Sequence, residues 1–176
     1  MTPDRQHLPP KRKSHRAKKR AHPPTLTEFI QEAERLHDRA LTMLRQDGHH
    51  SPIIVAWTRD GGREVIGLNL REGFPLTMGQ VLAGLVRRRR IVAFIAINEA
   101  WMTRGIAASL DIMPSQHPDR EQVLCVAAVH PEGKRMWCIP FAHEGGRLVL
   151  GTPLYSTGLS LGGTIPNALN SEEEER

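Results

Sequence analysis

The feature that most constrains the fold of this chain is a nearly continuous apolar run, IVAFIAINEAWM, at residues 91–102. Strands that face water on one side alternate apolar and polar residues, whereas an unbroken run is typical of a central strand covered on both faces. Its uninterrupted apolar part, Ile91–Ile97, is far shorter than the roughly 20 residues that a membrane-spanning helix needs. The run therefore predicts the centre of a sheet, and 176 residues provide for one domain of ordinary size around it.

The most strongly patterned helix precedes this strand. Thr25 and Glu28 have the spacing of a capping box, and Gly48 is a suitable residue for the end of a helix. Between them, apolar residues recur on one helical stripe. These are Leu26, Phe29, Ile30, Ala33, Leu36, Ala40, Leu41 and Leu44. The sequence therefore predicts an amphipathic helix between Thr25 and Gly48.

A hairpin and a second helix are expected next. Two runs rich in strand-forming residues, Ile53–Trp57 and Glu64–Leu70, flank an Asp-Gly pair, which is a strong signal for a hairpin turn. Residues Pro75–Arg90 carry inward apolar positions at helical spacing. Four arginines, Arg87–Arg90, close this segment, and positive charge suits the carboxyl end of a helix dipole.

Three further apolar runs, in REQVLCVAAV, RMWCIPFA and RLVL, are separated by turn residues at 131–133 and 144–146. This pattern predicts a three-stranded meander. The order of elements indicates an α+β fold, with a mostly antiparallel sheet of about six strands and two helices on one face of it.

Charge divides the chain into three parts. Residues 1–24 hold eight Lys or Arg against one acid, a net charge of +7. Residues 25–170 are nearly neutral at +1, and the last six residues, SEEEER, carry −3. We expect a disordered basic arm at 1–24, a single α+β domain at 25–152 and a loosely ordered tail with an acidic end at 153–176.

The arm has the clearest chemistry in the sequence. A flexible polycation attracts polyanions, and each phosphate contact releases counterions, so binding would be sequence-independent and strongly sensitive to salt. No aromatic residue interleaves the charges, so base stacking is not indicated. The alternative is an extension that only aids solubility. The residues expected to contact nucleic acid are Lys11, Arg12, Lys13, Arg16, Lys18, Lys19 and Arg20.

Localisation follows from what accompanies the arm. No apolar h-region follows the basic residues, and no lipid anchor is indicated, so neither secretion nor a membrane partner is expected. The two cysteines, Cys125 and Cys138, are too few for a disulfide framework and are expected to be buried, reduced thiols. The sequence therefore predicts a cytoplasmic protein.

One polar segment, PSQHPDREQ at 114–122, invites a catalytic interpretation. Written as an extended strand, it places His117, Asp119 and Glu121 on one face, because side chains repeat every second residue. These residue types bind Zn²⁺, Mn²⁺ or Mg²⁺, with His50 as a further candidate ligand. The competing interpretation is structural: a proline-stiffened entry to a strand whose polar groups pair locally.

Two further patterns could carry chemistry. Glu99 ends an apolar strand, where desolvation would favour a general base, although an ion pair with an arginine explains it as well. Asp119 with Glu132-x-Lys134 formally matches a metal-dependent nuclease pattern. That pattern requires Glu132 and Lys134 to lie on a strand facing Asp119, whereas Pro-Glu-Gly is typical of a turn.

The segments Gly48–Pro52, Glu99–Met102 and Pro114–Glu121 together give the chain a resemblance to a group of small bacterial proteins with Glu-Ala-Trp and Pro-Ser-x-His-Pro-Asp-Arg-Glu motifs. The resemblance spans about residues 26–152. It implies that this region is one domain, and it implies no reaction. Gln122 stands where a second acid would be expected, which weakens a carboxylate-rich metal site.

The function expected from these patterns is non-catalytic binding. The basic arm would contact nucleic acid while the sheet domain contacts a protein partner, with no cofactor. The alternative is a hydrolase that depends on a divalent metal and uses Glu99, His117, Asp119 and Glu121 as catalytic residues. In that alternative His117, Asp119, Glu121 and His50 would be the metal ligands.

Overall fold

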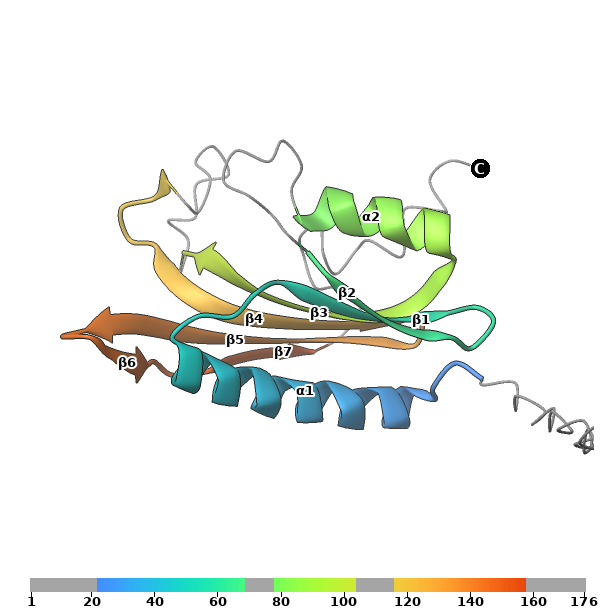
Figure 1. Ribbon diagram of the computed structural model, residues 1–176, viewed down its shortest axis with the longest axis horizontal. Helices are drawn as coiled ribbons and strands as arrows, with labels where there is room; N and C mark the ends of the chain where they lie inside the picture. The colour runs from blue at the N-terminus through green and yellow to red at the C-terminus, as the bar shows by residue number, and fades with distance from the viewer. Residues whose placement is uncertain (1–21, 69–77, 104–115, 158–176) are drawn as a thin grey trace, which may run out of the picture.

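The computed structural model describes residues 22–68, 78–103 and 116–157 and confirms the α+β class (Figure 1). Its two helices and seven strands follow the chain in a simple order. They are α1 (Leu26–Asp47), β1 (Ile53–Thr58), β2 (Arg63–Gly67), α2 (Met78–Arg89), β3 (Ile91–Met102), β4 (Glu121–His130), β5 (Gly133–Glu144), β6 (Arg147–Leu150) and β7 (Leu154–Thr157).

Helix α1 begins and ends where its sequence predicts. The backbone N–H of Thr25 donates to the Glu28 carboxylate at 2.9 Å, and the Glu28 N–H donates to the Thr25 hydroxyl, which completes a capping box. Gly48 ends the helix in the left-handed region at φ 73°, with its N–H bonded to the carbonyl of Leu44. The buried stripe includes Phe29, Ala33 and Leu44.

The strands form one sheet in the order β2-β1-β3-β4-β5-β6, and each described strand pair is antiparallel. The predicted hairpin is β1–β2, and the predicted meander is β4–β5–β6. A seventh strand, β7, pairs with β5 in the register Cys138↔Leu154. The sheet therefore continues past residue 152, where the domain was expected to end.

The two helices cover opposite faces of the sheet, and the expectation that they share one face is wrong (Figure 1). Alternate residues of β3 explain this, because they point to opposite faces. Ile95 and Ile97 pack with the buried stripe of α1, whereas Phe94 and Ala96 pack with Leu82 of α2. A central strand that is apolar on both sides needs a separate cover for each face, which is why each helix has its own core.

Candidate nucleic-acid interface

The turn between β1 and β2 is closed by its own hydrogen bonds. The backbone N–H of Thr58 donates to the Gly62 carbonyl at 2.9 Å, and the Gly61 N–H donates to the Thr58 carbonyl at 2.9 Å. The Thr58 hydroxyl bonds the Asp60 carboxylate and is the largest cause of a lowered pKa for that carboxyl. Asp60 therefore stays ionised, with its charge directed into the turn.

The end of α2 is joined to this turn by one backbone bond. The N–H of Arg59 donates to the carbonyl of Arg90 at 3.0 Å, directly after the last residue of the helix. Arg90 has φ 53°, and within the described ranges it is the one non-glycine residue with a positive φ. An L-residue in the left-handed region costs about 1–2 kcal/mol, and glycine is the usual residue after a helix. The bond to Arg59 helps to hold this conformation.

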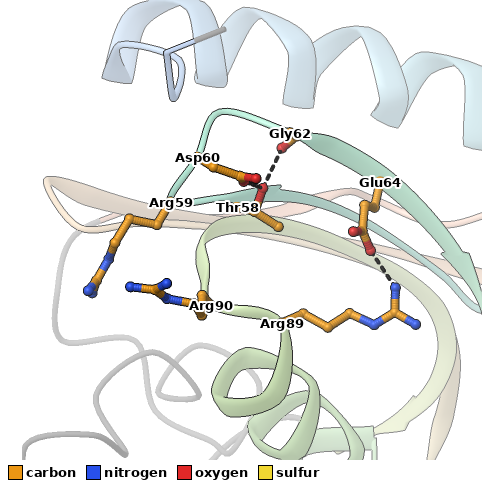
Figure 2. Close-up of a pocket in the computed structure, with 7 residues that line it drawn as sticks. All are labelled: Thr58, Arg59, Asp60, Gly62, Glu64, Arg89 and Arg90. Atoms are coloured by element: carbon orange, nitrogen blue, oxygen red, sulfur yellow. Dashed lines mark hydrogen bonds and ion pairs between the residues drawn. The ribbon is translucent and has the colours of Figure 1, made fainter. Parts of the chain in front are cut away.

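A cavity of about 460 Å³ lies between the turn and the helix end (Figure 2). It is lined by Thr58, Arg59, Asp60, Gly62, Glu64, Arg89 and Arg90. The guanidinium of Arg89 pairs with the Glu64 carboxylate at 2.5 Å. In Figure 2, Arg59 and Arg90 extend to the same side of the cavity, and within the described part of the chain neither side chain forms an ion pair. Among the residues that the structure describes, the cavity therefore presents two arginines that form no ion pair.

The basic arm joins the folded domain at the same end of the molecule. Figure 1 places the start of α1, the β1–β2 turn and the end of α2 together at the right. Two contacts fix the start of α1 there. The Nε2 of His130, the last residue of β4, lies 3.3 Å from the carbonyl oxygen of Pro24, and the rings of Phe29 and Trp57 pack edge to face at 5.3 Å. The seven arm residues proposed to contact nucleic acid, Lys11 to Arg20, lie outside the described residues.

The segment PSQHPDREQ is not an extended strand over its described part. The N–H of Arg120 donates to the carbonyl of His117 at 3.3 Å, which closes a turn with Pro118 at its second position, where proline is favoured. The ring Nδ1 of His117 accepts from the Asp119 N–H at 3.1 Å. Strand β4 begins only at Glu121. The predicted alternation of His117, Asp119 and Glu121 on one face is therefore wrong, because the turn breaks the strand period.

Glu99 is held by two hydrogen bonds. One carboxylate oxygen accepts from the backbone N–H of His50 at 2.5 Å, and the other accepts from the Gln122 amide at 2.9 Å. Glu121 lies opposite Met102, whereas Glu99 lies opposite Leu124, so the two glutamates point to opposite faces of the sheet. The structure brings Glu99 beside His50, but the four predicted catalytic residues do not converge.

The His50 side chain is 6% exposed, and burial lowers its pKa, while the nearby Glu99 charge acts in the opposite direction. Its Nδ1 has no hydrogen-bond partner within the described structure. Throughout residues 22–68, 78–103 and 116–157, no three His, Cys, Asp or Glu side chains are grouped so that they could hold a metal ion. The predicted metal set of His117, Asp119, Glu121 and His50 is not assembled there.

The fold also separates the two acidic residues of the nuclease-like pattern, Asp119 and Glu132. Asp119 lies before the first residue of β4, and Glu132 lies after its last. Nine residue steps along a strand correspond to about 30 Å, so the two carboxylates lie at opposite ends of the sheet. The turn predicted for Pro-Glu-Gly is confirmed, since β5 begins at Gly133.

Sequence patterns did not single out Arg59 as part of a basic site. Arg87–Arg90 stood out as a run, but Arg59 is an isolated charge next to a turn, and its relation to Arg90 depends on a contact between residues 31 positions apart. The one available signal was the position of Arg59 beside a tight hairpin turn, which exposes side chains at its rim.

Comparison of the chain with protein-family models, with curated proteins and with solved structures gives no match. The functional assignment therefore depends on the geometry of the site. No described helix is long and apolar enough to cross a membrane.

Proposed function

We propose that this protein is a non-catalytic nucleic-acid-binding protein, in which the arm contacts the phosphate backbone and the sheet domain contacts a protein partner. The observation that carries this proposal is the position of two exposed arginines, Arg59 and Arg90. They lie at the end of the domain where α1 begins. Because the arm precedes α1 in the chain, positive charge on the folded domain lies near the point where the arm is attached.

The expected mode of binding is electrostatic. Arginine matches phosphate geometry with two parallel N–H donors, and each neutralised phosphate releases counterions into solution. The described residues that line the cavity beside the β1–β2 turn include no aromatic side chain, so they offer no platform for base stacking. Contacts of this kind favour the backbone over the bases, which agrees with a protein that binds nucleic acid with little sequence preference.

The protein partner is proposed to meet the β7 edge of the sheet. Leu154 and Tyr155 on this strand are 38% and 52% exposed. Among the described strands β7 pairs with β5 alone, so its second edge presents backbone donors and acceptors. An extended segment of another protein can add to such an edge.

The hydrolase alternative gains no support from a specific observation. Glu99 is engaged by His50 and Gln122, and His117 is engaged in a local turn. Glu99 and Glu121 point to opposite faces of the sheet.

The test is fluorescence anisotropy of a labelled 20-base-pair DNA duplex, with the full chain and with a full-length variant carrying glutamine at the seven arm positions. We expect the affinity of the variant to fall by more than about ten-fold at low salt, because charge neutralisation removes phosphate contacts. A control for the loss of surface charge elsewhere replaces three arginines far from the arm end, as R45Q, R120Q and R147Q. Equal affinity for the wild type and the arm variant would contradict the proposal.

A further inference from the structure

We propose that the cavity between the β1–β2 turn and the end of α2 binds one phosphate group, held by Arg59 and Arg90. The inference rests on the proposed function and gives it a defined contact in the folded domain. The shared chemistry is a phosphate oxyanion, and the source we favour is the nucleic-acid backbone. We call this cavity the Arg59–Arg90 seat.

The charges around the seat leave these two arginines available. Glu64 is neutralised by Arg89 at 2.5 Å. Asp60 is bonded to the Thr58 hydroxyl, and the backbone of the turn also lowers its pKa. The charge of Arg90 also lowers the pKa of Asp60, as the smallest of the causes. Two guanidinium groups that share a cavity repel each other, and a bound anion would relieve this repulsion.

The backbone positions both arginines. The 3.0 Å bond from the Arg59 N–H to the Arg90 carbonyl ties the turn to the helix end, so the two side chains start from a fixed separation. The hydrogen bonds of the turn fix the backbone at Arg59, and the left-handed conformation of Arg90 sets the direction of the chain after α2. Residues held in sparsely populated backbone conformations concentrate at functional sites. A pre-positioned arginine pair loses little side-chain freedom when an anion binds.

The size and lining of the seat define the ligand class. A volume of about 460 Å³ exceeds that of one phosphate group and admits the adjoining sugars. The described lining holds three arginines and two carboxylates, a net charge of +1, so a free phosphate ion should bind weakly. When the phosphate belongs to a nucleic acid that the arm already binds, its effective concentration at the seat is higher than that of free phosphate. The seat therefore suits a backbone phosphate presented by nucleic acid.

The experiment compares full-length R59Q, R90G and R88Q in DNA binding by fluorescence anisotropy. Arg88 is exposed on the same helix but does not line the seat, so R88Q is a control of equal charge. We expect R59Q and R90G each to weaken binding by about three- to ten-fold and to reduce the salt slope by about one, with R88Q changing affinity less than about two-fold. Equal losses in all three variants would overturn the seat and leave only a diffuse basic surface.

R90G also separates binding from folding. Glycine adopts a positive φ without the penalty that arginine carries, so the thermal midpoint of R90G should not fall below that of the wild type. If R90G is as stable as the wild type but binds DNA more weakly, the loss of affinity is due to the missing Arg90 guanidinium and not to unfolding. R90G that binds DNA as well as the wild type would overturn the inference while the proposed function stands.

A second experiment uses inorganic phosphate as the ligand. Nuclear magnetic resonance of the ¹⁵N-labelled full chain should show the Nε–Hε signals of Arg59 and Arg90 shifting at millimolar phosphate, with Arg88 unchanged. Shifts of all arginines alike, as expected for an adventitious ion only, would overturn the seat. Shifts confined to Arg59 and Arg90, in a protein that does not bind DNA, would overturn the proposed function and assign the seat to free phosphate.

Discussion

The backbone N–H of Arg59 donates a 3.0 Å hydrogen bond to the carbonyl oxygen of Arg90, and this bond joins the β1–β2 turn to the end of α2. It brings two arginines without ion-pair partners among the described residues to one cavity, at the end of the domain where α1 begins. At the opposite end, Glu99 is engaged by the His50 N–H and the Gln122 amide.

Glu99 is expected to be structural. E99A removes the acceptor of the part-buried His50 N–H and of the Gln122 amide, so it should lower the free energy of unfolding by about 1–3 kcal/mol. Urea denaturation measures this change. The control is E121Q, on the other face of the sheet. A loss in E99A no larger than in E121Q would contradict the role assigned to Glu99.

His50 should make the protein less stable in acid. Burial lowers its pKa in the folded state, so the unfolded chain binds a proton more readily. This stabilising contribution is fully present above the unfolded pKa of about 6.5 and is lost as pH falls from there through the folded pKa. Denaturant unfolding between pH 7.5 and 5 should show a shallower pH dependence for H50Q than for the wild type. H37Q serves as the control, because His37 lies on α1 away from Glu99, and equal pH dependence in wild type and H50Q would count against the prediction.

The two helices should stabilise the fold independently. Leu44 of α1 and Leu82 of α2 are fully buried in separate clusters on opposite faces of the sheet. L44A and L82A should each cost about 2–5 kcal/mol of unfolding free energy. The double variant should cost their sum within about 0.5 kcal/mol, because the sites share no contact. A coupling above 1 kcal/mol would show that the two cores are not separate.

Cys125 and Cys138 should react with alkylating reagents at different rates. They are directly opposite on β4 and β5, with their sulfurs 3.7 Å apart. The shared hydrogen bond and burial raise the pKa of Cys125, and the same hydrogen bond lowers the pKa of Cys138. Because the thiolate is the nucleophile, iodoacetamide should modify Cys138 first. Peptide mass spectrometry over time measures the order, and earlier modification of Cys125 would contradict this assignment.

Local sequence signals predicted much of this fold. The capping box of Thr25 and Glu28 and the left-handed Gly48 define α1, and the Asp-Gly pair places the first hairpin. The face that each helix covers depends on long-range packing, which periodicity within a helix does not encode. The apolar character of β3 on both sides contained that information, since Phe94 and Ile95 each require a cover.

The candidate site was less predictable. The pattern of His117, Asp119 and Glu121 assumed a strand, but a proline at the second position of a turn ended that period. β7 was missed because its four residues are all exposed and alternate weakly. The contact between Arg59 and Arg90 is tertiary and leaves no local pattern. The basic arm, in contrast, is evident from charge alone, because its expected attraction to polyanions does not depend on how the chain folds.

The most direct test of the nucleic-acid proposal is the salt dependence of DNA binding by the full-length protein. A plot of log Kobs against log salt concentration should be linear, with a slope of about −6 if the seven cations of the arm each neutralise one phosphate. A steep linear slope would support binding through the arm. No detectable binding at 50 mM salt, or an affinity that does not change between 50 and 200 mM, would contradict the account.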